Sequence, residues 1–110
     1  MNIPFVEINN VAALDEFLAS SSNSAAVLFK HSNTCGVSSR AYDEMSKLRG
    51  PVGLVTVQKA RAVSNEMERR WGVTHETPQV LIVREHNLVW DASHSRVTAA
   101  AVESGLKEQR

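Results

Sequence analysis

The stretch AVLFKHSNTCGVS, residues 26–38, decides the fold class of this chain. An apolar run, Ala25 to Phe29, ends in polar residues, the only cysteine follows, and helix periodicity begins after it. A continuous apolar run bounded by polar residues is typical of a fully buried strand. If Gly36 begins a helix, the Cys35 sulfur lies at a helix N-terminus, where unpaired backbone N–H groups and the helix dipole favour a thiolate. Cys35 is therefore a candidate nucleophile.

Strand and helix patterns alternate along the rest of the chain. After Cys35, apolar residues recur at intervals of three and four until Gly50-Pro51, which predicts a helix that ends there. Two strand-like runs around the polar turn 85–87 indicate a hairpin. The predicted strands are residues 3–8, 25–29, 53–58, 79–84 and 88–92, and the predicted helices are residues 11–18 capped by Asn10, 37–48, 63–71, and 97–110 with Thr98 as a cap.

This order of elements predicts an α/β fold. Alternating strands and helices imply parallel pairing with helices on both faces of the sheet, and the hairpin adds antiparallel strands to it. With a thiol at the end of the second strand, the order resembles the thioredoxin fold, a central mixed sheet with helices on both faces. The 110 residues fit one such domain, residues 1–110.

Composition excludes several classes of function. Twelve basic and twelve acidic side chains balance, so there is no electrostatic reason to expect a nucleic-acid partner. No apolar run approaches the roughly 18 residues that span a membrane, and the N-terminus lacks a signal-peptide pattern. One cysteine allows no internal disulfide, which agrees with a reducing compartment. The sequence predicts a cytoplasmic protein without a membrane segment, and it leaves the oligomeric state open.

Three blocks of residues together resemble the monothiol bacilliredoxin family. They are Lys30-His31-Ser32 with Thr34-Cys35 and Ser38, then His75-Glu76-Thr77-Pro78-Gln79-Val80, then Trp90 with Ala92-Ser93-His94. The resemblance implies an enzyme that removes the small thiol bacillithiol from oxidised protein cysteines. It implies S-thiolated proteins as partners, bacillithiol as the thiol co-substrate, and no bound cofactor.

In that reaction the Cys35 thiolate would attack a sulfur of the mixed disulfide and keep the small thiol. The alternative for Cys35 is a buried structural cysteine. Ser38 stands where a dithiol thioredoxin has its second cysteine, and a hydroxyl cannot resolve a mixed disulfide, so an external thiol would finish the cycle. Ser38 is either a hydrogen-bond donor to the thiolate or an ordinary exposed helix serine.

Thr77-Pro78 precedes a predicted strand, where thioredoxin-like folds carry a cis proline beside the thiol. Only about 5–6% of X–Pro bonds are cis, so this expectation rests on the resemblance. The Thr77 backbone would then pair with an extended substrate. The alternative is a trans proline that starts an edge strand.

Three histidines are further candidates for substrate binding or proton transfer: His31, His75 and His94. For each of them, a surface or structural role is the alternative. No pair of histidines or cysteines has the short spacing of a zinc site, so no metal is predicted.

The chain departs from the family pattern beside the cysteine. The family usually carries proline there, and this chain has Gly36. Glycine restores a backbone N–H, which favours the thiolate, and loosens the first helical turn, which opposes it. Thr34, Gly36 and Ser38 are the predicted supporting residues around Cys35. Two other functions remain open. One is a thioredoxin-like binding or adaptor module without turnover, and the other is exchange with a different small thiol such as glutathione.

Overall fold

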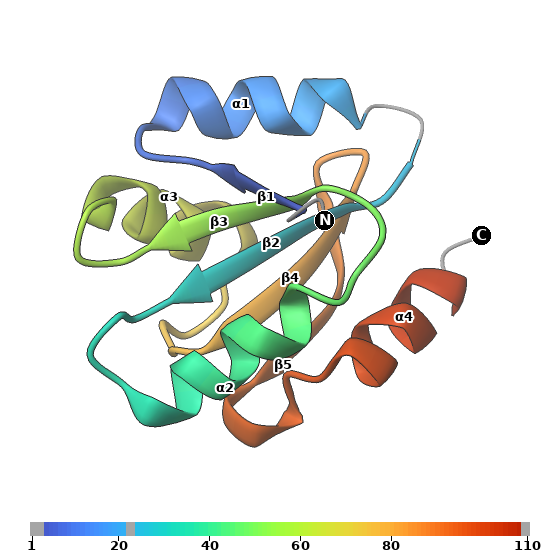
Figure 1. The fold of residues 1–110 in the computed structure, drawn as a ribbon. Helices are drawn as coiled ribbons and strands as arrows, with labels where there is room; N and C mark the ends of the chain where they lie inside the picture. The colour runs from blue at the N-terminus through green and yellow to red at the C-terminus, as the bar shows by residue number, and fades with distance from the viewer. Residues whose placement is uncertain (1–3, 22–23, 109–110) are drawn as a thin grey trace.

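The computed structural model describes residues 4–21 and 24–108. Strands and helices alternate through the first two thirds of this part of the chain, and a hairpin and a final helix follow (Figure 1). The strands are β1 Phe5–Glu7, β2 Ala26–His31, β3 Val52–Thr56, β4 Gln79–Arg84 and β5 Asn87–Ser93. The helices are α1 Val11–Ser20, α2 Gly36–Met45, α3 Arg61–Trp71 and α4 Ala99–Glu108, with a 3-10 turn, η1, at His94–Arg96.

The five described strands form one mixed sheet in the order β1-β3-β2-β4-β5. β1, β3 and β2 are mutually parallel, whereas β4 runs antiparallel to β2 and β5 antiparallel to β4. β2 is therefore the central strand, and all six of its residues are buried. The short strand with Pro4 before it lies at an edge, where a proline removes no ladder hydrogen bond.

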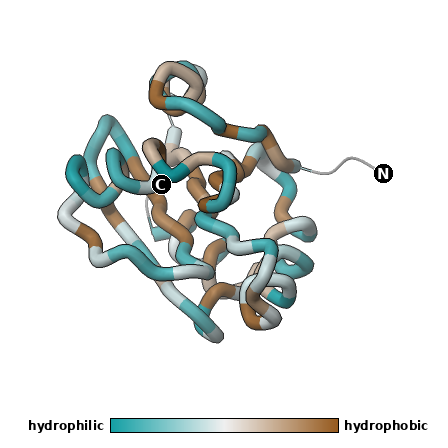
Figure 2. Tube along the Cα trace, turned by 90° about the vertical axis from the view of Figure 1, so that its left-hand side faces the viewer, coloured by the Kyte–Doolittle hydropathy of each residue, from teal (hydrophilic) through white to brown (hydrophobic). Residues whose placement is uncertain are grey.

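Helices cover both faces of the sheet, as the alternation predicted. α1 and α3 pack on one face, and α2 and α4 pack on the other (Figure 1). Because side chains alternate along a strand, β2 sends Leu28 into the α1/α3 core and Val27 and Phe29 into the α2/α4 core. Figure 2 shows hydrophobic stretches of the chain running through the middle of the molecule. Residues of β2, β3 and β4 are packed in these two cores, and the loops that follow β2 and precede β4 extend from the packed strands.

The sequence-based end of β2 was wrong by two residues. Lys30 and His31 were assigned to a polar boundary, but both belong to the strand and both are buried. Their polar atoms have partners inside the protein: Lys30 contacts His75, and His31 contacts Ser38. Buried polar groups are tolerated where they are hydrogen-bonded, and such long-range partners are invisible to a local pattern.

Other element boundaries shifted by a few residues. The strand predicted at 53–58 is Val52–Thr56, the helix after Cys35 ends at Met45 instead of Leu48, and the last helix begins at Ala99 after the 3-10 turn. Both predicted caps are present: Asn10 Oδ1 accepts the Ala13 N–H, and Thr98 Oγ1 accepts the Ala101 N–H. Residues 3, 109 and 110 of the predicted elements lie outside the described residues. Among the described helices, none is long and apolar enough to cross a membrane.

Candidate active site

Cys35 occupies the N-cap position of α2, directly after the loop that leaves β2. Its backbone is extended, with φ −113° and ψ 125°, and its carbonyl accepts the Ser39 N–H at 3.0 Å. The thiol is free and partly exposed, and the Cys35 side chain makes no capping hydrogen bond. The first backbone N–H groups of a helix have no partner within the helix. Those of α2 are therefore available to an anionic sulfur.

The loop before Cys35 is held by Gln58, which lies in the turn after the neighbouring parallel strand β3. Gln58 Nε2 donates to Ser32 Oγ at 2.9 Å and to Thr34 Oγ1 at 3.3 Å, and its Oε1 accepts the Asn33 N–H at 3.3 Å. Ser32 Oγ and Thr34 Oγ1 also contact each other at 3.2 Å. Thr34, a predicted supporting residue, thus helps to fix the loop. Gln58 itself was missed by the sequence reasoning.

Ser38 lies one turn into α2 and is fully buried, so the alternative of an exposed helix serine was wrong. Its Oγ accepts the Ser32 N–H at 2.9 Å and lies 2.8 Å from His31 Nδ1. No hydrogen bond joins Ser38 to Cys35 among the described residues. The structure instead uses this hydroxyl to hold α2 against the end of β2.

His31 is a buried ring on the α2 face of the sheet. It packs between Phe29 and Tyr42, with ring centroids 5.6 Å and 5.0 Å away. Burial lowers the pKa of His31, although a hydrogen bond with the Ser38 backbone opposes that shift. A neutral imidazole can accept the Ser38 proton at Nδ1. This placement corresponds to the structural alternative that the sequence left open for His31.

The Thr77–Pro78 peptide bond is cis, as the resemblance implied. Gln79, the next residue, pairs with Lys30, so this bond lies at the end of the sheet from which the Cys35 loop projects. The Pro78 carbonyl accepts the His94 N–H at 2.8 Å, and His94 Nε2 lies 2.7 Å from a Glu76 carboxylate oxygen. The structure therefore brings Pro78 and His94 together.

His75 is turned away from the α2 side of the sheet. Its Nδ1 lies 2.7 Å from the Lys30 ammonium and 3.0 Å from Ser64 Oγ of α3. Burial, and then the charge of Lys30, lower the pKa of His75. Burial also lowers the pKa of Lys30 to about 8, against the attraction of Glu68 and Glu76. Lys30, with no exposed surface, is the second residue that the sequence reasoning missed.

A pocket of about 280 Å³ lies between α2 and η1. Val37 and Arg40 of α2 line one side, and His94 and Ser95 line the other. Val37, two residues after Cys35, is 47% exposed, which is unusual for a large apolar side chain of this protein. An apolar side chain, a cation, a histidine and the Glu44 carboxylate thus surround a concave surface beside α2.

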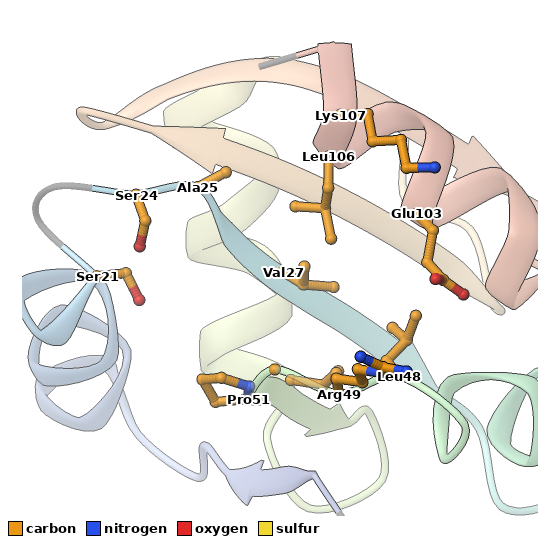
Figure 3. Close-up of a pocket in the computed structure, with 12 residues that line it drawn as sticks. Ser21, Ser24, Ala25, Val27, Leu48, Arg49, Pro51, Glu103, Leu106 and Lys107 are labelled. Carbon is orange, nitrogen blue, oxygen red and sulfur yellow. The ribbon is translucent and has the colours of Figure 1, made fainter. Parts of the chain in front are cut away.

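A second pocket, of about 350 Å³, lies at the other end of β2 from the cysteine (Figure 3). Leu106 points from α4 toward Val27, and Arg49, Glu103 and Lys107 supply the charged groups. No cysteine or histidine is among the described residues that line this pocket. It therefore holds no group for thiol exchange.

In the described part of the chain, no three histidine, cysteine, aspartate or glutamate residues are arranged to hold a metal ion.

Comparison with known proteins identifies the family. The family model described as monothiol bacilliredoxin BrxC matches residues 6–102. The chain belongs to this family. This match covers all of the site residues named above, from Lys30 to Ser95, and it confirms the resemblance that the three sequence blocks carried.

Solved structures confirm the thioredoxin fold. A protein assigned as an oxidoreductase with a thioredoxin fold superposes with a TM-score of 0.84 at 22% identity, over 93% of each chain. Thioredoxin of Fasciola hepatica gives a TM-score of 0.78 at 12% identity, over 94% of this bacilliredoxin-family chain and 98% of the thioredoxin. The reduced thioredoxin pre-protein of Schistosoma mansoni gives 0.74 at 16% identity, over 96% and 98%. At such identities the likeness establishes the fold alone.

Proposed function

We propose that this protein is a monothiol oxidoreductase that removes bacillithiol from S-bacillithiolated proteins in a reducing compartment such as the cytoplasm. The observation that carries the proposal is the free, partly exposed Cys35 at the N-cap of α2, in a member of the monothiol bacilliredoxin family. Unpaired N–H groups at a helix start stabilise negative charge, and the thiolate is the reactive form of cysteine.

The proposed reaction has two exchange steps. In the first, the Cys35 thiolate attacks the bacillithiol sulfur of the mixed disulfide, and the S–S bond to the protein breaks. The substrate cysteine leaves as a thiolate and takes a proton from solvent, while Cys35 carries the bacillithiol as a new mixed disulfide. In the second, an external low-molecular-weight thiolate attacks this disulfide, which forms a small-molecule disulfide and releases the Cys35 thiolate. The external thiol supplies the two electrons, because Cys35 has no partner cysteine.

Two features of the site suggest where the substrate lies. Thr77 lies just before the first residue of β4, where an extended protein segment would pair with its backbone. The pocket between α2 and η1 would take the anionic part of the small thiol at Arg40 and His94. The Glu44 carboxylate also lines this pocket, and it is already paired with Lys47 and the Ala99 N–H. In this proposal, Thr34 and Gly36 shape the cysteine loop, and His31 and Ser38 hold α2 in place.

The test is transfer of one bacillithiol from an S-bacillithiolated protein to Cys35, followed by mass spectrometry of the intact proteins. We expect one adduct on the wild-type chain and none on Cys35→Ser, with free thiol appearing on the substrate. The same substrate carrying glutathione is the matched control for the identity of the small thiol. A wild-type chain that accepts neither adduct would refute the enzyme and leave the adaptor module as the better explanation.

A further inference from the structure

Lys30 is an unusual residue outside the cysteine loop, because it is a fully buried cation that forms no salt bridge with any carboxylate in the part of the chain that the structure describes. It points from the central strand toward the α3 face, opposite to its neighbour His31. A buried charge without a counter-ion costs free energy, so its retention calls for a compensating contact. The contact that the structure provides is His75 Nδ1, at 2.7 Å.

This contact fixes the protonation of the imidazole. An ammonium group only donates, so His75 Nδ1 must be the acceptor, and the ring is neutral with its proton on Nε2. Ser64 Oγ lies 3.0 Å from the same nitrogen, which ties the ring to α3 as well as to β2. His75 itself is exposed, although its contacts with Lys30 and Ser64 remove part of the ring from water.

His75 belongs to a short loop, residues 73–78, which is fastened along its length. Gln79 Nε2 donates to the Thr74 carbonyl at 3.1 Å, and Gln79 is the cross-strand partner of Lys30. On the other side, His94 binds Glu76 and the Pro78 carbonyl. Thr77 is the residue in the middle of these contacts. The Thr77 backbone therefore lies between two sets of contacts. On one side Lys30 holds His75, and on the other side His94 holds Glu76 and Pro78.

We propose that Lys30 is a positioning residue for substrate recognition, which holds the Thr77 backbone ready to pair with a protein substrate by anchoring His75. The inference rests on the proposed function, and it adds a residue that touches neither the thiol nor the substrate. Lys30 acts on the opposite side of the sheet from α2, so its loss affects docking of an extended chain more than the reactivity of Cys35.

The contact between the Lys30 ammonium and His75 Nδ1 requires a neutral His75, so it depends on pH. When acid protonates His75, Nδ1 loses its lone pair and two positive charges face each other at 2.7 Å. The other charges around the pair are Glu68 and Arg61 of α3 and Glu76 of the loop. The two glutamates favour a positive charge on either group, whereas burial, Lys30 and Arg61 oppose a charge on His75 and lower its pKa overall. The arrangement therefore supports the ammonium with a neutral imidazole.

The test compares two reactions of the same variants. In Lys30→Met, which keeps the length of the apolar stem, we expect kcat/KM for an S-bacillithiolated protein to fall roughly ten-fold or more, mainly through KM. Alkylation of Cys35 by iodoacetamide, which needs no docking strand, should stay within about two-fold of wild type. Equal losses in both reactions, or no loss in either, would overturn the positioning role.

His75 provides the matched pair of variants. Asparagine presents an oxygen near the position of Nδ1, so His75→Asn should restore most of the activity that His75→Leu loses. On acidification below the ordinary histidine range, the wild-type kcat/KM should fall more steeply than the rate of Cys35 alkylation, which reports protonation of the thiolate alone. His75→Asn should remove this additional fall. Equal defects in the two variants would contradict the anchor.

Failure of the proposed function is distinguishable from failure of this inference. If wild type transfers no bacillithiol, the anchor is still measured by amide hydrogen exchange. We expect the N–H groups of residues 74–77 to exchange faster in Lys30→Met than in wild type, while those of β3 stay protected. Unchanged exchange in this loop would show that Lys30 does not hold it.

Discussion

Replacing Gly36 by proline should stabilise this protein. Gly36 is the first residue of α2, a position where the backbone N–H has no partner within the helix and the fixed φ of proline already fits. A residue before proline must be extended, and Cys35 has φ −113° and ψ 125°. A side chain at position 36 also meets open space, because no heavy atom lies within 4 Å of a Cβ built there.

The expected gain comes from the unfolded chain, which loses conformational freedom when glycine is replaced. At a compatible site this effect is about 0.4–1 kcal/mol. For a domain of this size, such a gain corresponds to a rise in melting temperature of roughly 2–6 °C. Urea unfolding should show a higher midpoint with an unchanged slope, since the surface exposed on unfolding stays the same.

Gly36→Ala is the matched control, because alanine also restricts the unfolded chain but keeps the N–H beside the sulfur. We expect both variants to be stabilised, and we expect iodoacetamide to modify Cys35 more slowly in the proline variant than in the alanine variant. That difference measures what the additional N–H contributes to the reactivity of the thiol. A proline variant that unfolds at lower urea than wild type would refute the compatible backbone described for residues 35 and 36.

Three further predictions test the packing and the buried polar groups. Gly53→Ala should destabilise the fold by about 1–3 kcal/mol in urea unfolding, because its Cβ would lie 2.6 Å from Ile8 Cδ1 in a packed core; a neutral result would mean that this core is loose. Ser38→Ala should cost about 1–3 kcal/mol, since it leaves His31 Nδ1 and a backbone N–H buried without their partner, whereas Ser39→Ala on the exposed side of α2 should cost little. Lys30 should make stability rise between pH 8 and 10.5, because its pKa is about 8 in the folded protein and about 10.5 in the unfolded one, so the unfolded chain binds more protons in that range. The rise should approach about 3 kcal/mol at most and be absent in Lys30→Met; parallel pH profiles for the two proteins would contradict it.

Local patterns predicted most of the fold because its elements carry their own signals. The helix after Cys35 shows regular apolar spacing and a Gly-Pro stop, and the strand before it is a continuous apolar run. Boundaries were less accurate where a polar residue is buried. Lys30 ended the predicted strand because lysine is rarely buried, and only its contact with His75, 45 residues away, explains why the strand continues.

In the site, too, residues with a local signal were predicted, whereas residues identified only by long-range contacts were missed. Cys35, its helix start and the cis bond before Pro78 all follow from neighbours in the chain or from the family blocks. Gln58 carried one usable signal, because the carboxyl ends of parallel strands meet at one edge of a sheet, and Gln58 follows β3 as the cysteine loop follows β2. Which atom each side chain contacts there depends on packing that the sequence does not display.

The sequence by itself determined the order of strands and helices, the single thiol at a helix start, and the absence of a second cysteine that could pair with it. Periodicity and helix caps depend on residues that are close in the chain, and the number of cysteines is read directly from the composition. Only the tertiary structure decided that Ser38 faces His31, and that Lys30 and Ser64 hold His75 beside the cis bond. Such contacts join residues far apart in the chain, and the sheet brings them together because its central strand is buried on both faces.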